Sequence, residues 1–379
     1  MTDPNESIER LLAQADQLPN DSPSRVAIFE EAISIADSHR LEQHSFDIRR
    51  AILFPALHTG QSHKLIVHFA WCASRCRLDP TTFPIRQLLW EYRNIGIQLG
   101  VFHTVPADQI EAVIAEMRGL YVEEGISLRP CLQVRRLVST FLADAEAGEA
   151  AHRQLESTPR DEWSDHLLTE RSFSIAWLIF RQDYEAASVL LEPYLTGKIA
   201  DPHSMTESTS SMLLPLMMCG RYEDAMRAHL KSAKRAMGNL RYLDFAADHI
   251  AFLALTGNLM ESLKCLAKML PAALGANNHV DQYRFGVRVL IALESASRQG
   301  IEEVRMRLSR ELFLYQPDGA YRIDELRLRL LEWTRPLAAR FDARNGNDWF
   351  TKELGRVGEY ADLTRRLPLP GGKSSKHPE

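Results

Sequence analysis

The chain has 379 residues, of which 45% are hydrophobic and 25% are charged, and its formal net charge is −5. These proportions are those of an ordinary folded protein. The acidic balance argues against a nucleic-acid partner, because such surfaces need a basic excess to displace counterions from phosphates. No run approaches roughly eighteen uninterrupted apolar residues, so we expect no membrane span.

The N-terminal residues and the cysteines bear on where the protein works. The first ten residues are polar and acidic, and they lack the basic start and apolar run of a secretory signal. The five cysteines are scattered along the chain: Cys72, Cys76, Cys131, Cys219 and Cys265. An odd number of widely spaced cysteines in a large chain is typical of a reducing compartment. We therefore expect a cytoplasmic protein.

Apolar residues recur at helical spacing from the start of the chain. The first clear face has members three or four residues apart, at Val26, Phe29, Ile33 and Ala36. Ser22 and Pro23 before them suit an N-cap and a first helical position. The same spacing continues along most of the chain, and we find no sustained alternation with a period of two. The pattern predicts helices and no strands.

Short glycine-containing turns separate the expected helices, at Gly60, Gly100, Gly148, Gly220, Gly257 and Gly300. The helices between such turns are expected to be roughly ten to eighteen residues long, and connections this short make neighbouring helices antiparallel. Five prolines fall in or near these helices, at Pro55, Pro193, Pro215, Pro271 and Pro336. Each is expected to kink or end its helix.

A sequence signature recurs in the second half of the chain. Residues 182–187, 220–225 and 257–262 read QDYEAA, GRYEDA and GNLMES, and a looser copy, GIEEV, begins at Gly300. The third residues of the first three copies, Tyr184, Tyr222 and Leu259, are 38 and 37 residues apart. Self-similarity at a fixed period is typical of helical solenoids.

These residues resemble the tetratricopeptide repeat (TPR), in which a Gly-x-Tyr-x-x-Ala turn joins helix A to helix B. Glycine accepts the left-handed conformation that ends helix A. The resemblance covers about residues 165–317, where Pro317 would close the fourth unit, and 43–80 more loosely. It implies an all-α fold, a right-handed α-solenoid of antiparallel helix hairpins, or TPR-like superhelix.

The predicted organisation has four parts. Residues 1–160 would form divergent N-terminal helical repeats, and residues 161–320 would form the TPR-like repeats. Residues 321–367, rich in arginine, would form C-terminal capping helices, because terminal repeats need a polar outer surface. Residues 368–379 are rich in Pro, Gly, Ser and Lys, which predicts a disordered tail.

The resemblance also implies a binding surface, because the inner wall of a TPR-like fold comes from the first half of each A helix. Alignment of the repeats predicts eight partner-binding residues on that wall: Thr169, Ser172, Glu207, Ser210, Asp244, Asp248, Arg284 and Arg288. Asp281 precedes the last two at helical spacing. This wall would be a polar, partly acidic groove with a basic end, suited to an extended peptide or helix with a positive segment. The alternative is an ordinary solvated helix face.

One other cluster has a spacing that suits metal ligands. His68, Cys72 and Cys76 are four residues apart on one expected helix. The competing interpretation is that Leu65 and Phe69 form a buried stripe with the two cysteines, since cysteine is readily buried. We favour the buried stripe and expect no metal site.

Catalytic motifs are absent from the sequence: it has no dinucleotide-binding glycine loop, P-loop, zinc-protease motif or nucleophile elbow. We therefore expect no catalytic residue and no cofactor, and we interpret the chain as a non-catalytic scaffold or adaptor for a protein or peptide partner. Two alternatives stay open. One is a peptide-responsive regulatory receptor of TPR-like type, and the other is a helical enzyme or small-ligand-binding α/α fold. Homo-oligomerisation also stays open.

Overall fold

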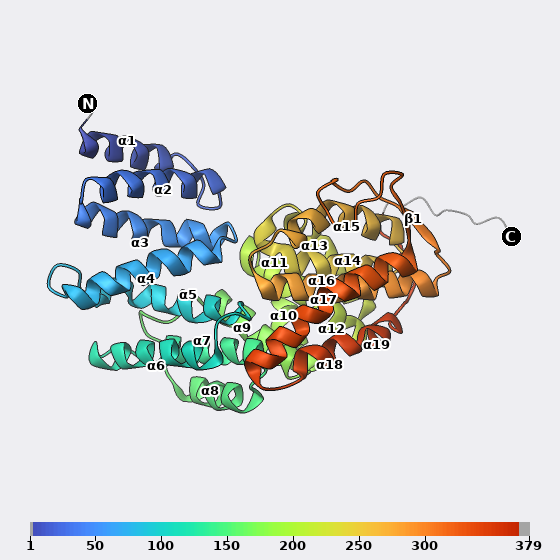
Figure 1. Ribbon diagram of the computed structural model, residues 1–379. Coiled ribbons are helices and arrows are strands. Elements are labelled where there is room, and N and C mark those ends of the chain that lie inside the picture. The colour runs from blue at the N-terminus through green and yellow to red at the C-terminus, as the bar shows by residue number, and fades with distance from the viewer. Residues whose placement is uncertain (1–2, 371–379) are drawn as a thin grey trace. The chain divides into compact units, whose positions relative to one another are not determined.

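The computed structural model describes residues 3–370, and helices account for nearly all of its regular structure (Figure 1). The prediction of an all-α fold is confirmed at that level. The chain divides into two compact units. Unit 1 comprises the described residues through Val138 together with Arg153–Ser164, and unit 2 comprises Ser139–His152 together with the described residues from Asp165 onward. The predicted boundary at residue 160 lies close to this division, but Ser139–His152 belongs to unit 2.

Unit 1 is built from helices that each pack against the next helix along the chain. Its elements are α1 (Pro4–Asp16), α2 (Pro23–Ser38), α3 (Glu42–His58), α4 (Ser62–Leu78), η1 (Ile85–Leu88), α5 (Leu89–Gly100) and α6 (Ala107–Glu123). Successive contacts join α1 through α6 in order. The face predicted for α2 is buried as expected. Two further helices, α7 (Arg129–Leu142) and α8 (Ala145–Ser157), have residues in both units.

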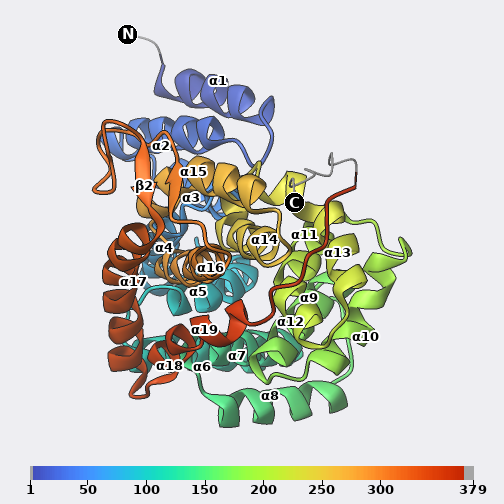
Figure 2. The same ribbon diagram turned by 90° about the vertical axis from the view of Figure 1, so that its right-hand side faces the viewer.

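Unit 2 contains a row of helices in which the first helix of each hairpin lies beside the first helix of the next (Figure 2). This first row consists of α9 (Leu167–Phe180), α11 (Pro202–Ser211), α14 (Leu243–Leu255) and α16 (His279–Arg298). Their hairpin partners are α10 (Tyr184–Leu195), α13 (Tyr222–Ala236) and α15 (Leu259–Leu274). The short helices α12 (Leu213–Met218) and η2 (Leu240–Tyr242) complete this part. Consecutive hairpins therefore stack, as the repeat signature predicted.

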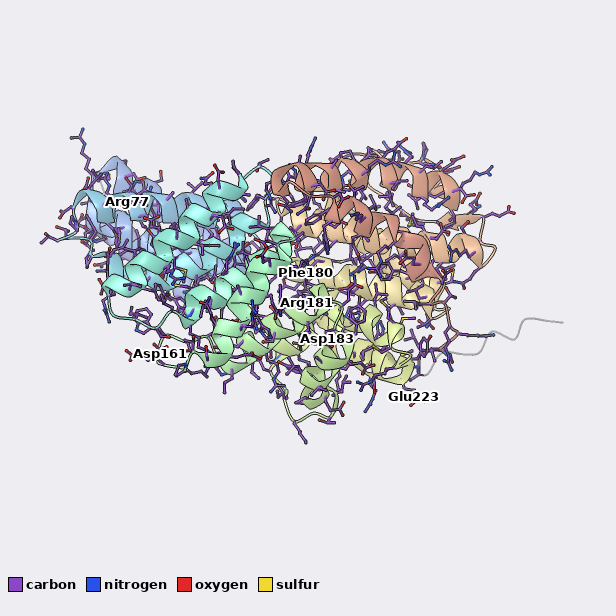
Figure 3. The ribbon with its side chains drawn as sticks, turned by 90° about the horizontal axis from the view of Figure 1, so that it is seen from below. Arg77, Asp161, Phe180, Arg181, Asp183 and Glu223 are labelled. Atoms are coloured by element: carbon purple, nitrogen blue, oxygen red, sulfur yellow. The ribbon has the colours of Figure 1, made fainter. Side chains whose placement is uncertain are left out.

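The signature residues form the turns between paired helices. Gly220 and Gly257 have φ values of +70° and +77°, in the left-handed region that glycine enters without steric cost. Gln182 takes the same conformation, with φ +58°, between the labelled residues Arg181 and Asp183 of Figure 3. The Asp183 side chain accepts a hydrogen bond from the Ala186 amide and so caps α10.

Four of the five prolines have one of two effects, whereas Pro336 lies inside α17 (Ile323–Asn345), which continues past it and does not end there as predicted. Three helices end within three residues after their proline, namely α3 after Pro55, α10 after Pro193 and α15 after Pro271. Pro215 lies at the start of α12, and the helix is interrupted at Met212 between α11 and α12. Proline has no amide hydrogen and its ring clashes with the carbonyl four residues earlier, which accounts for the break.

The looser fourth copy of the signature was predicted wrongly. After Gly300 the chain forms β1 (Glu303–Arg305), which pairs antiparallel with β2 (Ala320–Arg322) in the register Val304 to Tyr321. Pro317 lies in the loop between the strands and closes no helix. The sequence does alternate here, because Val304, Met306 and Leu308 are buried while the residues between them are exposed. A period of two places alternate side chains on opposite faces, and the run is short enough to be overlooked.

The C-terminal part of unit 2 consists of α17 (Ile323–Asn345), α18 (Trp349–Gly355) and α19 (Val357–Ala361). Helix α17 packs against α16 and α18, and α19 packs against α16. An extended segment follows α19. The Leu369 amide donates to Asn258 Oδ1 at 3.3 Å, so the tail predicted from Pro368 starts with a fixed contact. Residues 371–379 of that predicted tail lie outside the described residues.

Candidate functional site

Three ion pairs follow the first-row helices of unit 2, and we call their six residues the charge ladder. Glu207 on α11 accepts from Arg241 of η2 at 3.3 Å. Asp244 on α14 accepts from Arg284 of α16 at 3.1 Å, and one turn further on Asp248 accepts from Arg288 at 2.6 Å. Aspartates four residues apart on one helix therefore meet arginines four residues apart on the next.

The ladder is largely buried but still reaches solvent. The Arg284 side chain is 43% exposed and the Glu207 side chain is 26% exposed, whereas the Asp248 side chain is only 11% exposed. Burial nevertheless raises the pKa of Glu207, and it raises the pKa of Asp248 to about 6 although Arg288 opposes the shift. Burial, with the charge of Asp244 added, also raises the pKa of Asp281 at the start of α16.

The C-terminal helices add aromatic and charged groups beside the ladder. The Arg288 guanidinium lies 5.9 Å from the centre of the Tyr360 ring. The Tyr360 hydroxyl donates to Glu353 Oε1 at 2.6 Å, and Arg356 forms an ion pair with Glu353 at 3.1 Å. Burial raises the pKa of Tyr360 above its usual value of about 10. Tyr360, Glu353 and Arg356 thus form a hydrogen-bonded network next to Arg288.

The structure places the eight predicted partner-binding residues in three environments. Glu207, Asp244, Asp248, Arg284 and Arg288 belong to the ladder, and Thr169 is half-buried on α9. Ser172 and Ser210 are buried. The Ser172 hydroxyl lies 3.1 Å from the Ser208 hydroxyl, and Ser210 is fully buried beside His249, so these two serines join helices instead of facing solvent.

The charge pattern also differs from the one expected. Arg284 and Arg288 do not form a separate basic end, because each is paired with an aspartate of the neighbouring helix. Arg241 was missed in the sequence, although its position 34 residues after Glu207 is close to the repeat period. A search for oppositely charged residues about one repeat period apart would have found Arg241 as a partner for Glu207.

A second polar cluster lies behind the ladder in the core of unit 2. His229 Nδ1 lies 2.9 Å from His249 Nδ1, and His249 Nε2 lies 3.0 Å from the Ser210 hydroxyl and 3.3 Å from the Ser232 hydroxyl. Burial lowers the pKa of His229 to about 4 and lowers the pKa of His249 as well. A contact between two Nδ1 atoms needs one hydrogen and one lone pair, so the two rings cannot both be protonated. The lowered pKa values leave both rings neutral at neutral pH.

The histidine and cysteine cluster of α4 has a core environment. Cys72 and Cys76 are buried with Leu65 and Phe69, and burial raises the pKa values of the two thiols to about 12 and about 11. Metal ligation requires the thiolate, which this environment disfavours. Among residues 3–370, no three His, Cys, Asp or Glu side chains are arranged to hold a metal ion.

Two further findings bear on the class of protein. In the part of the chain that the structure describes, no helix is both long and apolar enough to cross a membrane. No protein-family model matches the chain, and no curated protein matches it either.

Proposed function

We propose that unit 2 is a TPR-like right-handed superhelix that binds an extended protein or peptide partner along its charge ladder, and that the chain is a scaffold or adaptor. The supporting feature of the fold is its period. Side-chain contacts between successive first-row helices join residues 36 to 40 apart in sequence, as in Ser172–Ser208, Ser210–His249 and Asp248–Arg288. This separation agrees with the period of 37 and 38 residues between the turn signatures.

The single observation that carries the proposal is the partly buried and still reachable charge of the ladder. Burying ionised side chains costs free energy, and the raised pKa values of Glu207 and Asp281 reflect this cost. Perturbed ionisable groups gather at functional sites more often than elsewhere. Arg284, the most exposed of the three arginines, offers donors to peptide carbonyls, and the carboxylates offer acceptors to amides or to a basic side chain.

The test begins with a random peptide library selected on the full chain. A selected peptide is then titrated by fluorescence anisotropy against the double variant Glu207→Gln, Arg284→Gln. These neutral replacements keep side-chain length and hydrogen-bonding groups. We expect at least a tenfold loss of affinity.

The matched control is the double variant Glu261→Gln, Lys264→Gln, which removes an exposed ion pair on α15. It should change the affinity by less than twofold, because exposed pairs contribute little. Equal losses in the two double variants, or a library that yields no selective peptide, would overturn the proposal.

One observation favours a second candidate, a small-ligand site in the same place. A carboxyl group with a pKa of about 6, as at Asp248, changes protonation near neutral pH and suits proton transfer. A thermal-shift screen of charged metabolites separates the two candidates. A metabolite that stabilises the wild-type chain but not the variant Asp248→Asn would support the small-ligand site.

A further inference from the structure

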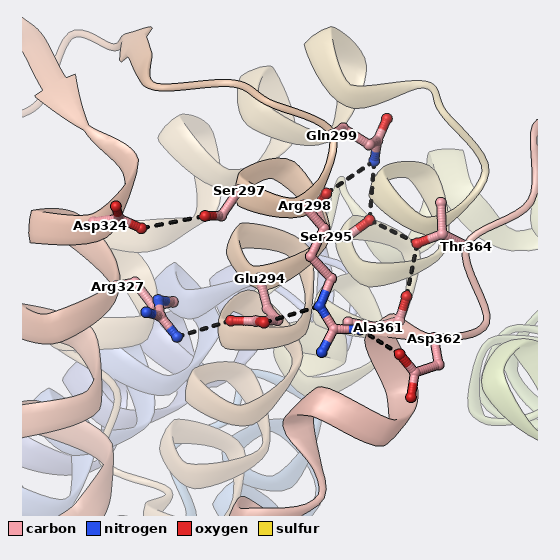
Figure 4. Close-up of polar contacts among 10 residues, drawn as sticks. All are labelled: Glu294, Ser295, Ser297, Arg298, Gln299, Asp324, Arg327, Ala361, Asp362 and Thr364. Carbon is pink, nitrogen blue, oxygen red and sulfur yellow. Dashed lines mark hydrogen bonds and ion pairs between the residues drawn. The ribbon is translucent and has the colours of Figure 1, made fainter.

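The segment after α19 turns at Asp362 and Leu363 and then runs over unit 2 without helical structure, and we call residues 362–369 the C-terminal strap. Its first contacts are with the end of α16, as Figure 4 shows. Asp362 pairs with Arg298, and the Thr364 hydroxyl lies 3.1 Å from the Ser295 hydroxyl. Arg298 is also held by Glu294, which pairs with Arg327 of α17 as well. This end of the strap is therefore fixed by side chains.

Beyond Thr364 the contacts are made by the strap backbone. The Arg365 amide donates to the Leu255 carbonyl at 2.8 Å, and the Leu367 amide donates to the Thr256 carbonyl at 2.9 Å. Both acceptors lie at the C-terminal end of α14, where carbonyl groups have no partner within the helix. The strap thus satisfies acceptors that the turn between α14 and α15 presents.

Asn258 holds the strap with both ends of its amide group. Its Nδ2 donates to the Leu367 carbonyl at 2.8 Å, and its Oδ1 accepts from the Leu369 amide at 3.3 Å. Asn258 is also the N-cap residue of α15, yet its side chain makes no capping hydrogen bond there. Asparagine at this position usually caps its own helix, whereas here its amide group contacts the strap and the Thr256 hydroxyl, which lies 2.9 Å from Nδ2.

The sequence of the strap matches this pattern of donors. The amides of Arg365, Leu367 and Leu369 donate, and they alternate along an extended chain, so they point to one side. Pro368 and Pro370 stand at positions between and after these donors, where an amide hydrogen is not used. Proline lacks that hydrogen and favours extended backbone, so the strap is already prepared for this conformation.

One side chain adds specificity, and little of the strap is buried. The Arg365 guanidinium lies 4.4 Å from the centre of the Tyr222 ring, a cation–π contact with a residue of the turn signature. Arg365, Arg366 and Pro368 are exposed. Backbone hydrogen bonds with little apolar burial open at low free energy, so the strap can leave its place without unfolding the helices.

We propose that Tyr222 and Leu255–Asn258 form a binding site for an extended peptide, that the C-terminal strap occupies it as an intramolecular ligand, and that a partner peptide binds by displacing the strap. The expected ligand is an extended peptide that has an arginine two positions before a leucine and free amide donors at alternate positions. The site shares no residue with the charge ladder, so it goes beyond the function proposed above and is tested separately. A tethered ligand competes at an effective concentration in the millimolar range.

The experiment uses a fluorescein-labelled peptide with the sequence of residues 361–370, ADLTRRLPLP, titrated into full-length protein. In the variant Leu367→Pro the strap loses the amide that donates to Thr256, so its own site should be open. We expect the peptide to bind this variant at least tenfold more tightly than it binds the wild-type chain. Adding Asn258→Ala to the variant should lower the affinity at least tenfold.

The matched controls are two peptides with a single N-methyl group. Methylation of the Leu367 amide removes a donor that the site uses and should weaken binding at least tenfold, whereas methylation of the Arg366 amide should change it less than twofold. Equal affinity of the peptide for the wild-type and Leu367→Pro chains, or equal loss from the two methyl groups, would overturn the proposal.

A second measurement does not depend on the folding of the proline variant. In the wild-type chain, the amides of Leu367 and Leu369 should exchange hydrogen more slowly than amides of an unstructured chain, though faster than those of the buried helices. Asn258→Ala should speed their exchange at least fivefold. Helical circular dichroism should stay unchanged. Unaltered exchange at these two amides would contradict the assigned role of Asn258.

Discussion

Unit 1 and unit 2 each contain an arginine–aspartate ion pair of nearly equal length, and the two aspartates respond in opposite ways. Asp37 in unit 1 pairs with Arg49 at 2.7 Å, and Asp248 in unit 2 pairs with Arg288 at 2.6 Å. The hydrogen bond from Arg49 lowers the pKa of Asp37, whereas burial raises the pKa of Asp248 to about 6. The chemistry of the pair is the same, so the environment decides the sign.

The difference follows from exposure. The Asp37 side chain is 46% exposed, and there the arginine does not have to offset a large loss of hydration. Asp248 is 11% exposed and lies among other carboxylates, including Asp244. Because the pKa of Asp248 is raised, its ion pair does not fully offset the cost of burying the acid, and such a pair is weak evidence for stability. The partner that we propose would use these charges, and this is our explanation for a row of partly buried ion pairs.

The largest expected effect is the loss of stability when the arginine of each pair is replaced. Arg288→Met should destabilise unit 2 by about 3 kcal/mol, because it leaves Asp248 buried without a partner. Arg49→Met should destabilise unit 1 by about 1 kcal/mol, because solvent can hydrate the half-exposed Asp37. Native-state hydrogen exchange of the buried helices measures each unit separately.

The control for this pair of variants is Asp248→Asn in the Arg288→Met background. Removing the orphaned charge should recover much of the lost stability. Equal losses in Arg49→Met and Arg288→Met, or no recovery in the double variant, would show that burial does not distinguish the two pairs.

A smaller effect on stability is expected from the buried histidines. Burial lowers the pKa of His229, and no carboxylate opposes this shift. The pKa of His229 falls from about 6.5 in the unfolded chain to about 4 in the fold. The unfolded state therefore binds the proton more readily, and stability that is full above pH 6.5 is lost as the pH falls toward 4. Between pH 7 and pH 5 the wild-type chain should lose about 2 kcal/mol relative to His229→Gln.

His68 of unit 1 provides the comparison for this experiment. Burial lowers its pKa as well, but Glu30 and Asp37 oppose the shift and the side chain is only half-buried. His68→Gln should therefore change the pH dependence in the same direction and by less. The measurement is urea unfolding of each variant at both pH values. A pH dependence that is the same in the wild-type chain and His229→Gln would contradict the assigned role of His229.

The helices and their stacking could be predicted because the signals are local or periodic. The spacing of Val26, Phe29, Ile33 and Ala36 defines a helix face without any knowledge of its neighbours. The turn signature locates the hairpins of unit 2 for the same reason. The hairpin of β1 and β2 was missed because its alternating run is short and follows a glycine that matched the helical signature.

The candidate site could be predicted only as a set of residues. Repeat alignment placed Asp244 and Asp248 on one helix and Arg284 and Arg288 on the next, but the pairing depends on how closely the two helices stack. Burial of Ser210 depends on the same distance, which no local pattern specifies. Residues 362–367 of the strap were predicted within the capping helices and residues 368–369 as tail. Neither prediction could find the strap's contacts, because its partners, such as Asn258, lie more than a hundred residues earlier.

The smallest expected effect concerns the turn conformation, which the two units share. Arg40 in unit 1 and Gln182 in unit 2 have φ values of +55° and +58°, where most turns of unit 2 have glycine. The left-handed conformation costs a residue with a Cβ about 1 kcal/mol or more, and a glycine avoids this cost. Glycine also loses more conformational entropy on folding, which cancels part of the stabilisation. Gln182→Gly and Arg40→Gly should therefore each stabilise their unit by about 0.5 kcal/mol.

The reverse change at Gly220 provides the opposing measurement. A Cβ there would meet no atom within 4 Å, so the cost of Gly220→Gln is conformational and not steric. It should destabilise unit 2 by about 1 kcal/mol in hydrogen exchange, while Gln182→Ala should leave stability nearly unchanged. If Gln182→Gly destabilised the protein instead, the Gln182 side chain would have to make a stabilising contact. The turn of α9 and α10 would then differ in kind from the glycine turns that follow it.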